Sequence, residues 1–250
     1  MDLGEDEDIY LARVKWLPNG NLTAQIQNRA QSRLDLIAFD PTTGRGETLL
    51  TETSAVWINL HNMFRPLKNG RFIWASERTG FMHLYLYDKA GGWERPLTSG
   101  EWQVGSLDGV DEENGLVYFC GTMDGPTERH LYVVGFDGGQ PQRLTREPGS
   151  HNVTLDHAFT RFIDQYDSLT QPPVINLRVL KTGKRRHTLF TPNDPRLESL
   201  TLPPPEIVTL STRDGVTLYG ALYRPPAASG AGPFPGHRSR VWWATRPACG

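Results

Sequence analysis

The residues that could do chemistry are seven histidines, two cysteines and scattered serines. Five of the histidines are spread over the chain, at His61, His83, His130, His151 and His157. Zinc sites normally use tighter local pairs of His and Cys, so we predict no metal site and no cofactor. No serine has glycine both two residues before it and two residues after it, as a nucleophile elbow requires, so we predict no catalytic residue.

One stretch combines aromatic and polar side chains and is the better candidate for contact with a substrate. It runs from Trp57 to Phe64, and we predict that Trp57, His61 and Phe64 lie near bound substrate. The alternative is that its aromatic rings only pack between strands, as buried aromatic side chains usually do. His83 and His130 both precede Leu-Tyr, and we expect them to be structural, each with a hydrogen-bonded imidazole.

These residues are positioned by a repeat. Strand-like phrases end in Leu50-Thr51, Leu97-Thr98 and Leu144-Thr145, so the intervals 97 − 50 and 144 − 97 are both 47 residues. A weaker fourth copy ends in Leu189-Phe190-Thr191. A period of roughly 40–50 residues built from short strands is typical of β-propeller blades.

The pattern predicts an all-β fold with a partial β-propeller of about four four-stranded blades in residues 1–191. The blades are expected from Tyr10 to Thr51, from Trp57 to Thr98, from Trp102 to Thr145 and from His151 to Thr191. The first strand of the second blade is predicted over residues 58–64. Rings of seven or eight blades are commoner than rings of four, so we interpret the chain as about half a propeller.

The repeat stops after Thr191. Residues 192–205 are rich in proline and predict a stiff linker. Two further strands, joined by the turn at Asp214-Gly215, then predict a hairpin within residues 206–235. Residues 236–250 fit no strand pattern.

The bulk composition indicates which classes of binding partner and which cellular compartment to expect. The net charge of −2 gives no reason to expect a nucleic-acid partner. No apolar run approaches the ~20 residues that cross a bilayer, and the acidic N-terminus lacks a signal-peptide core, so we predict no membrane association. Two cysteines cannot form a disulfide framework, which favours a cytoplasmic protein with Cys120 as a buried free thiol.

Six phrases carry a family resemblance. They are Trp57-Ile58-Asn59-Leu60-His61, residues 75–85, Thr98-Ser99-Gly100-Glu101-Trp102, residues 130–134, Pro204-Pro205-Glu206-Ile207 and residues 217–223. In these phrases the chain resembles the dipeptidyl peptidase IV family of serine peptidases, within the prolyl oligopeptidase clan. The likeness is greatest to the cytosolic dipeptidyl peptidase 8 and 9 branch.

The resemblance implies a fold and an activity. Members join an eight-bladed propeller to an α/β-hydrolase domain and release N-terminal Xaa-Pro dipeptides from peptide substrates by acyl transfer to serine. It implies that residues 1–191 are the C-terminal half of the propeller, that 206–235 begin a truncated hydrolase domain, and that the parent protein is a homodimer. The fragment lacks the triad, so we predict no activity from it alone. The alternative is a non-enzymatic propeller scaffold that binds other proteins.

The tail suggests a disturbed reading frame. Read one base later, codons for residues 236–250 permit Thr-Val-Ala-Val and then Tyr-Gly-Gly-Pro, which the family has in its first hydrolase strand. We therefore hypothesise that the tail is frameshifted; the alternative is a genuine short C-terminus.

Overall fold

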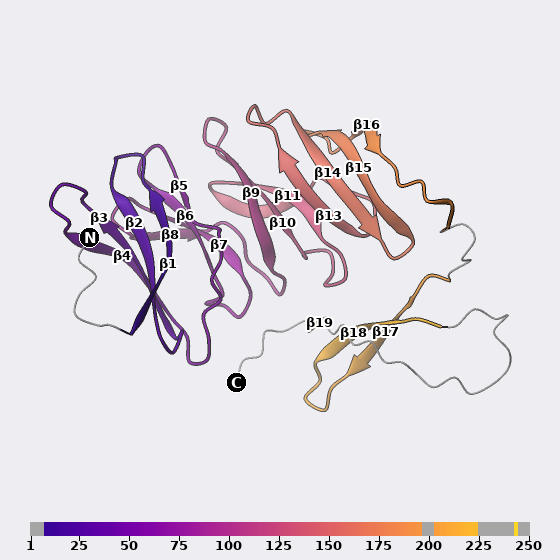
Figure 1. Ribbon diagram of the computed structural model, residues 1–250, viewed down its shortest axis with the longest axis horizontal. Helices are drawn as coiled ribbons and strands as arrows, with labels where there is room; N and C mark the ends of the chain where they lie inside the picture. The colour runs from indigo at the N-terminus through magenta and orange to yellow at the C-terminus, as the bar shows by residue number, and fades with distance from the viewer. Residues whose placement is uncertain (1–7, 197–202, 225–242, 245–250) are drawn as a thin grey trace.

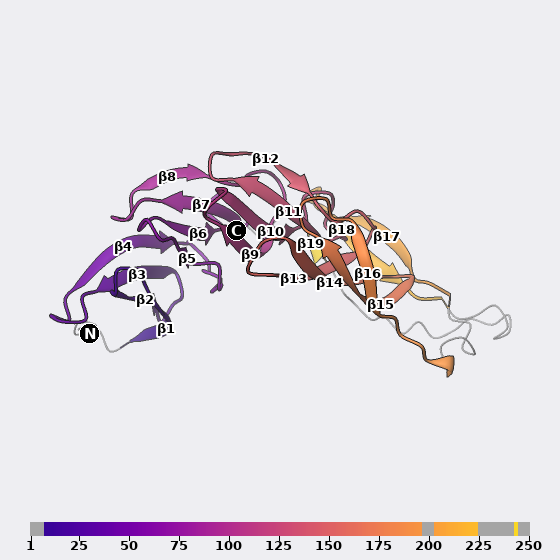
Figure 2. The ribbon, with the colours of Figure 1, turned by 90° about the horizontal axis from the view of Figure 1, so that it is seen from above.

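The repeat folds into separate antiparallel sheets. The computed structural model describes residues 8–196, 203–224 and 243–244. Four four-stranded sheets follow one another along the chain (Figure 1), and each contains four consecutive strands. Seen from above, the sheets form a curved row (Figure 2). This confirms the prediction of an all-β fold with four propeller-type blades.

The strands of the blades have the following bounds. Blade one contains β1 (Ile9–Trp16), β2 (Leu22–Asn28), β3 (Arg33–Phe39) and β4 (Gly46–Thr53). Blade two contains β5 (Arg65–Pro66), β6 (Phe72–Ser76), β7 (His83–Tyr87) and β8 (Trp93–Pro96). Blade three contains β9 (Val104–Asp111), β10 (Leu116–Gly121), β11 (His130–Gly135) and β12 (Gly138–Arg143). Blade four contains β13 (Ser150–Leu155), β14 (Arg161–Ser168), β15 (Gln171–Val179) and β16 (Arg185–Phe190).

The prediction of a strand over residues 58–64 is wrong. The first strand of blade two is only β5, and the preceding residues form a loop. This loop is tied to blade one, because the Ile58 amide donates to the Gln31 carbonyl at 2.9 Å and the Ile58 carbonyl accepts from Gln27 Nε2 at 3.1 Å. Both backbone polar groups of Ile58 are therefore satisfied by blade one and not by the sheet of blade two.

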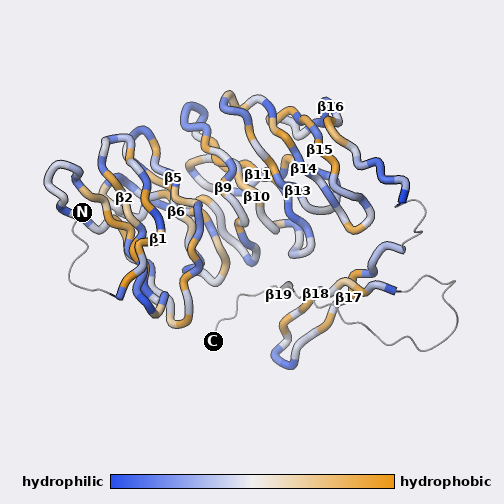
Figure 3. The backbone as a smooth tube through the Cα atoms, viewed as in Figure 1, coloured by the Kyte–Doolittle hydropathy of each residue, from blue (hydrophilic) through white to orange (hydrophobic). Residues whose placement is uncertain are grey.

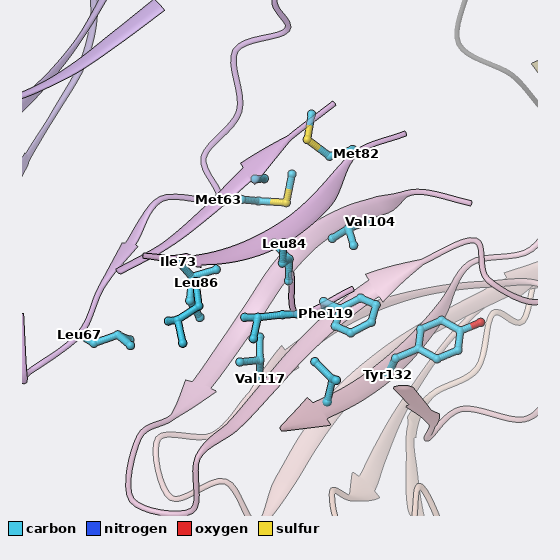
Figure 4. Packing of buried hydrophobic residues seen from close by; sticks show 13 residues of the cluster. Met63, Leu67, Ile73, Met82, Leu84, Leu86, Val104, Val117, Phe119 and Tyr132 are labelled. Atoms are coloured by element: carbon cyan, nitrogen blue, oxygen red, sulfur yellow. The ribbon is translucent and has the colours of Figure 1, made fainter. Parts of the chain in front are cut away.

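Apolar side chains fill the spaces between adjacent blades. Hydropathy along the chain shows apolar stretches within strands and hydrophilic turns between them (Figure 3). Between blades two and three, Leu84 and Leu86 pack with Val117 and Phe119 (Figure 4), and all four are fully buried. The alternating pattern in the sequence thus marks the inner faces of stacked sheets.

In blades two and four, one turn glycine allows the blade to dock closely on the blade before it. Gly91 lies in the turn between β7 and β8 with φ of +84°, and a Cβ there would lie 1.7 Å from the Leu49 carbonyl oxygen. Gly183, in the corresponding turn of blade four, has φ of +67°, and its Cβ would lie 1.7 Å from the Leu144 carbonyl oxygen. Only glycine fits such contacts.

The Leu-Thr phrase has a clear structural basis. Thr98 Oγ1 lies 3.0 Å from His83 Nδ1 and accepts a hydrogen bond from the Leu84 amide at 3.0 Å. Thr145 Oγ1 makes the same pair of contacts with His130 Nδ1 and the Leu131 amide, each at 3.1 Å. Both histidines are fully buried, which confirms their predicted structural role.

The residues after the blades form a separate small sheet. It contains β17 (Glu206–Ser211), β18 (Thr217–Leu222) and β19 (Trp243–Ala244). The predicted hairpin is confirmed, with Gly215 at φ of +81° in its turn. The tail was not expected to hold a strand, yet β19 pairs with β18 at Leu218 and Tyr219. The rest of the tail lies outside the described residues.

Candidate functional site

The loop of residues 54–64 lies at the seam between blades one and two. Ser54 Oγ accepts hydrogen bonds from the amides of Val56 and Trp57 and so starts the loop with a tight turn. The three site residues predicted from the sequence differ in how exposed their side chains are. Trp57 is 56% exposed, His61 is half-buried, and Phe64 is buried between the rings of Phe72 and Trp74.

A cavity of about 250 Å³ opens at this seam, and we call it the seam cavity. Trp57 and His61 both line it, whereas Phe64 does not. Its other principal lining residues are Gln25, Leu34, Glu52, Asn59, Trp74, Glu77, Arg78 and Met82. The seam cavity therefore combines an apolar floor with charged and amide groups, which is typical of ligand-binding clefts.

The charged wall of the seam cavity is a compact cluster around Glu52. Its Oε1 accepts from Arg78 Nη2 at 2.7 Å and from Trp74 Nε1 at 3.2 Å, and its Oε2 accepts from Ser76 Oγ at 2.9 Å. Arg78 also stacks on the Tyr85 ring, 4.3 Å from its centroid. Sequence reasoning did not find Glu52, although it directly follows the first Leu-Thr pair, where the other copies have Ser99 and Arg146.

His61 holds the loop in place. Its Nδ1 accepts from the Met63 amide at 3.2 Å, and its ring meets the Trp74 ring edge-on at 4.8 Å. Burial lowers the pKa of His61 to about 4, despite a hydrogen bond to the Ala75 backbone, and the charge of Arg13 lowers it further. The imidazole is neutral at neutral pH and its Nδ1 is occupied by the Met63 amide, so we assign it a role in positioning the loop.

A second hollow of about 300 Å³ lies on the other side of Gln25, and we call it the basic groove. It is lined by Arg13, Val14, Lys15, Thr23, Gln25, Asn62 and Phe64. Lys15 Nζ donates to the Phe64 carbonyl at 3.0 Å, and Arg13 Nε donates to Asn62 Oδ1 at 2.6 Å. Burial and the nearby charge of Arg65 lower the pKa of Lys15.

A buried acid–base cluster in blade four has a structural role. His151 Nδ1 lies 2.8 Å from Asp164 Oδ1, and Arg178 Nε donates to Asp164 Oδ2 at 2.6 Å. His151 and Asp164 are fully buried and Arg178 is only 3% exposed. The His151–Asp164 pair resembles the histidine and aspartate of a catalytic triad, but it is buried, so a substrate could not reach it. No serine of the described ranges is among its hydrogen-bonding partners.

In the part of the chain that the structure describes, no group of three or more His, Cys, Asp or Glu side chains could hold a metal ion. The described residues also include no helix that is both long enough and apolar enough to span a bilayer.

Comparison with known proteins decides the family. Residues 1–173 match the model of the dipeptidyl peptidase IV (DPP IV) N-terminal region. The chain belongs to the dipeptidyl peptidase IV family. Human dipeptidyl peptidase 8 is 31% identical over 277 residues, which cover 86% of this chain and 31% of that protein. Dipeptidyl-aminopeptidase B of Aspergillus niger is 28% identical over 249 residues, with 92% of this chain and 28% of that protein covered.

The fold agrees with this family membership. The crystal structure of Porphyromonas gingivalis dipeptidyl peptidase 4 superposes with a TM-score of 0.81 at 25% identity. The match covers 90% of this chain and 32% of that chain. The chain thus spans less than a third of the length of the relatives it matches, and its blades correspond to one part of a dipeptidyl peptidase.

Proposed function

We propose that these four blades are the substrate-guiding half-propeller of a serine-type dipeptidyl peptidase that releases N-terminal Xaa-Pro dipeptides. The observation that carries the proposal is the match of residues 1–173 to the dipeptidyl peptidase IV N-terminal region. The proposal includes a cytoplasmic location and a homodimeric parent, as the resemblance to the dipeptidyl peptidase 8 and 9 branch implies.

The proposal divides the chain into four parts. Residues 1–191 form half of the propeller, 192–205 the linker, and 206–235 the start of the hydrolase domain, with 236–250 read out of frame. The separate sheet of β17 and β18 supports the division, because it shares no strand with the blades. A pure scaffold would need no such appended hairpin.

Within the propeller, the seam cavity is the proposed contact with substrate residues beyond the scissile bond. Trp57 is the residue best placed to touch a peptide, because it lines the seam cavity and remains 56% exposed. His61 and Phe64 act differently: His61 fixes the loop, and Phe64 anchors it in the interblade core. The wall is polar, because Glu52 pairs with Arg78 and Glu77 accepts a hydrogen bond from the Asn59 side-chain amide.

The test is an assay with a fluorogenic Gly-Pro substrate. The 250-residue chain alone should give no turnover, whereas the protein encoded by a continuous reading frame through the hydrolase domain should give turnover that a serine-directed inhibitor abolishes. In that protein, Trp57→Ala should raise KM by roughly threefold or more for a longer peptide, with a smaller change in kcat.

A neighbouring residue provides the matched control. Val56 is 60% exposed but does not line the seam cavity, so Val56→Ala should leave KM unchanged. Equal KM values for the Trp57 and Val56 variants would overturn the role of the seam cavity. No turnover by the continuous protein would overturn the proposed activity.

A further inference from the structure

The basic groove gathers positive charge that the protein itself does not neutralise. Arg13 and Lys15 line it from β1, and Arg65 on β5 is close enough for its charge to lower the pKa of Lys15. Among the described residues, the ion pairs involve other side chains and include none of these three cations. The Lys15 ammonium has only a backbone carbonyl as its acceptor, and the Arg13 Nε–H only an amide oxygen.

Other arginines of the chain show the contrast. Arg78 is paired with Glu52 at 2.7 Å, and Arg178 is paired with Asp164 at 2.6 Å and with Glu147 at 2.9 Å. Arg13 is partly buried and Lys15 is exposed, and cations that meet only neutral acceptors forgo the stronger charge-assisted hydrogen bond that a carboxylate would supply. The positive charges of Lys15 and Arg65 also repel each other, so the binding of an anion in the basic groove would be favoured.

Gln25, which lines both the basic groove and the seam cavity, carries an unused acceptor. Gln25 is only 4% exposed, and its Oε1 has no hydrogen-bond partner among the described residues. A buried amide oxygen without a partner is unfavourable unless a ligand or a water molecule donates to it. A ligand that fits both observations carries a carboxylate and, nearby, an N–H donor.

We propose that the basic groove binds the acidic side chain of a peptide. The Asp or Glu carboxylate would contact Arg13 and Lys15, and a peptide N–H would donate to Gln25 Oε1. The exposed Val14 offers apolar surface for the aliphatic part of that side chain. This inference rests on the proposed function, since it specifies which peptides the half-propeller prefers.

Isothermal titration of the 250-residue chain at low salt tests the inference. The probes are acetyl-Ala-Glu-Ala-amide, its isosteric partner acetyl-Ala-Gln-Ala-amide, and inorganic phosphate. The glutamate peptide should bind about tenfold more tightly than the glutamine peptide, because only the carboxylate makes charge-assisted contacts with Arg13 and Lys15. Its affinity should fall as salt is raised, since the groove is open to solvent.

Variants locate the effect. Arg13→Gln and Lys15→Gln should each remove most of the preference for glutamate. Arg45→Gln, an exposed arginine in the turn between β3 and β4 of the same blade, should keep it. The peptide comparison on the unaltered chain needs no variant, so it stands even if a substitution impairs folding.

Two outcomes would overturn the inference. Equal binding of the two peptides, including no binding of either, would show that the groove does not select a carboxylate. Phosphate binding equal to that of the glutamate peptide, with the same dependence on Arg13 and Lys15, would indicate a site for free oxyanions instead. Either result leaves the Gly-Pro assay unaffected, so failure of this inference and failure of the proposed function are distinguishable.

Discussion

At the scale of residues, the most consequential side chains are buried polar groups that satisfy one another. Asp164 accepts from Arg178 Nε and contacts His151 Nδ1, and all three side chains are buried. Asp164→Ala leaves the Arg178 cation without its buried carboxylate, so we expect a loss of about 3–5 kcal/mol in the free energy of unfolding. Urea denaturation monitored by tryptophan fluorescence measures it.

Asp137→Ala is the matched control. The side chain of Asp137 is fully exposed and pairs with Arg95 at 3.2 Å on the surface, so its removal should cause no measurable change. A similar effect of both substitutions would contradict the structural role assigned to the cluster in blade four.

The neutral state of His61 predicts a dependence of stability on pH. Its folded pKa of about 4 lies below the ordinary value of 6.5, so the unfolded chain binds the extra proton first as the pH falls. The free energy of unfolding should therefore fall between pH 6.5 and 4, by about 2 kcal/mol from this residue. His61→Gln should flatten that part of the profile, measured by urea titrations at about pH 7 and about pH 4.5.

The comparison of wild type with the His61 variant isolates this contribution, because the buried His83 and His130 are common to both. Burial lowers the pKa of each of those two residues as well. Parallel profiles for wild type and variant would show that His61 is not held neutral.

At the scale of elements, the docking of neighbouring blades depends on turn glycines. Gly91→Ala places a methyl group against the Leu49 carbonyl and strains a positive φ, so we expect a loss of roughly 2–4 kcal/mol in the free energy of unfolding. Gly20 has a similar φ of +88°, but nothing lies within 4 Å of the point that an alanine methyl group would occupy there. Gly20→Ala should therefore cost only about 1 kcal/mol. Equal losses in thermal or urea unfolding would contradict close docking of blade two on blade one.

Most of the blade bounds could be predicted from the sequence, but one strand could not. Blades one, three and four begin and end within a few residues of the expected bounds. The prediction of the first strand of blade two is wrong. Residues 58–64 have a composition suited to a strand, but Ile58 forms hydrogen bonds with Gln27 and Gln31 of blade one. Such contacts depend on tertiary packing, which local propensity does not contain.

The candidate site was predictable only in part, for a related reason. Aromatic and polar composition pointed to Trp57 and His61, and both line the seam cavity. Glu52 and Arg78 are 26 positions apart, and Arg13 and Asn62 are 49 apart, so no local spacing brings either pair together. Phe64 belongs to the same loop as Trp57 but packs in the interblade core, which composition alone could not distinguish.

At the scale of the whole molecule, three features support one account of the protein: the sequence repeat, the family membership and the proposed shift of the reading frame. The number of copies of the 47-residue repeat predicts the number of blades, because each copy folds into one sheet that must bury its faces against its neighbours. Family membership then identifies the blades with the N-terminal region of the dipeptidyl peptidase IV family. In the proposed division, the hairpin of β17 and β18 begins the hydrolase domain, and residues 192–205 link it to the propeller.

The most direct test of the central claim is the sequence of the transcript from codon 225 onward. We predict that a shift of one base near codon 236 opens a continuous frame, which encodes Tyr-Gly-Gly-Pro and, further along, a Gly-x-Ser-x-Gly elbow. A stop codon soon after the shift, or a long continuation without the elbow, would contradict the assignment of these blades to a serine-type dipeptidyl peptidase.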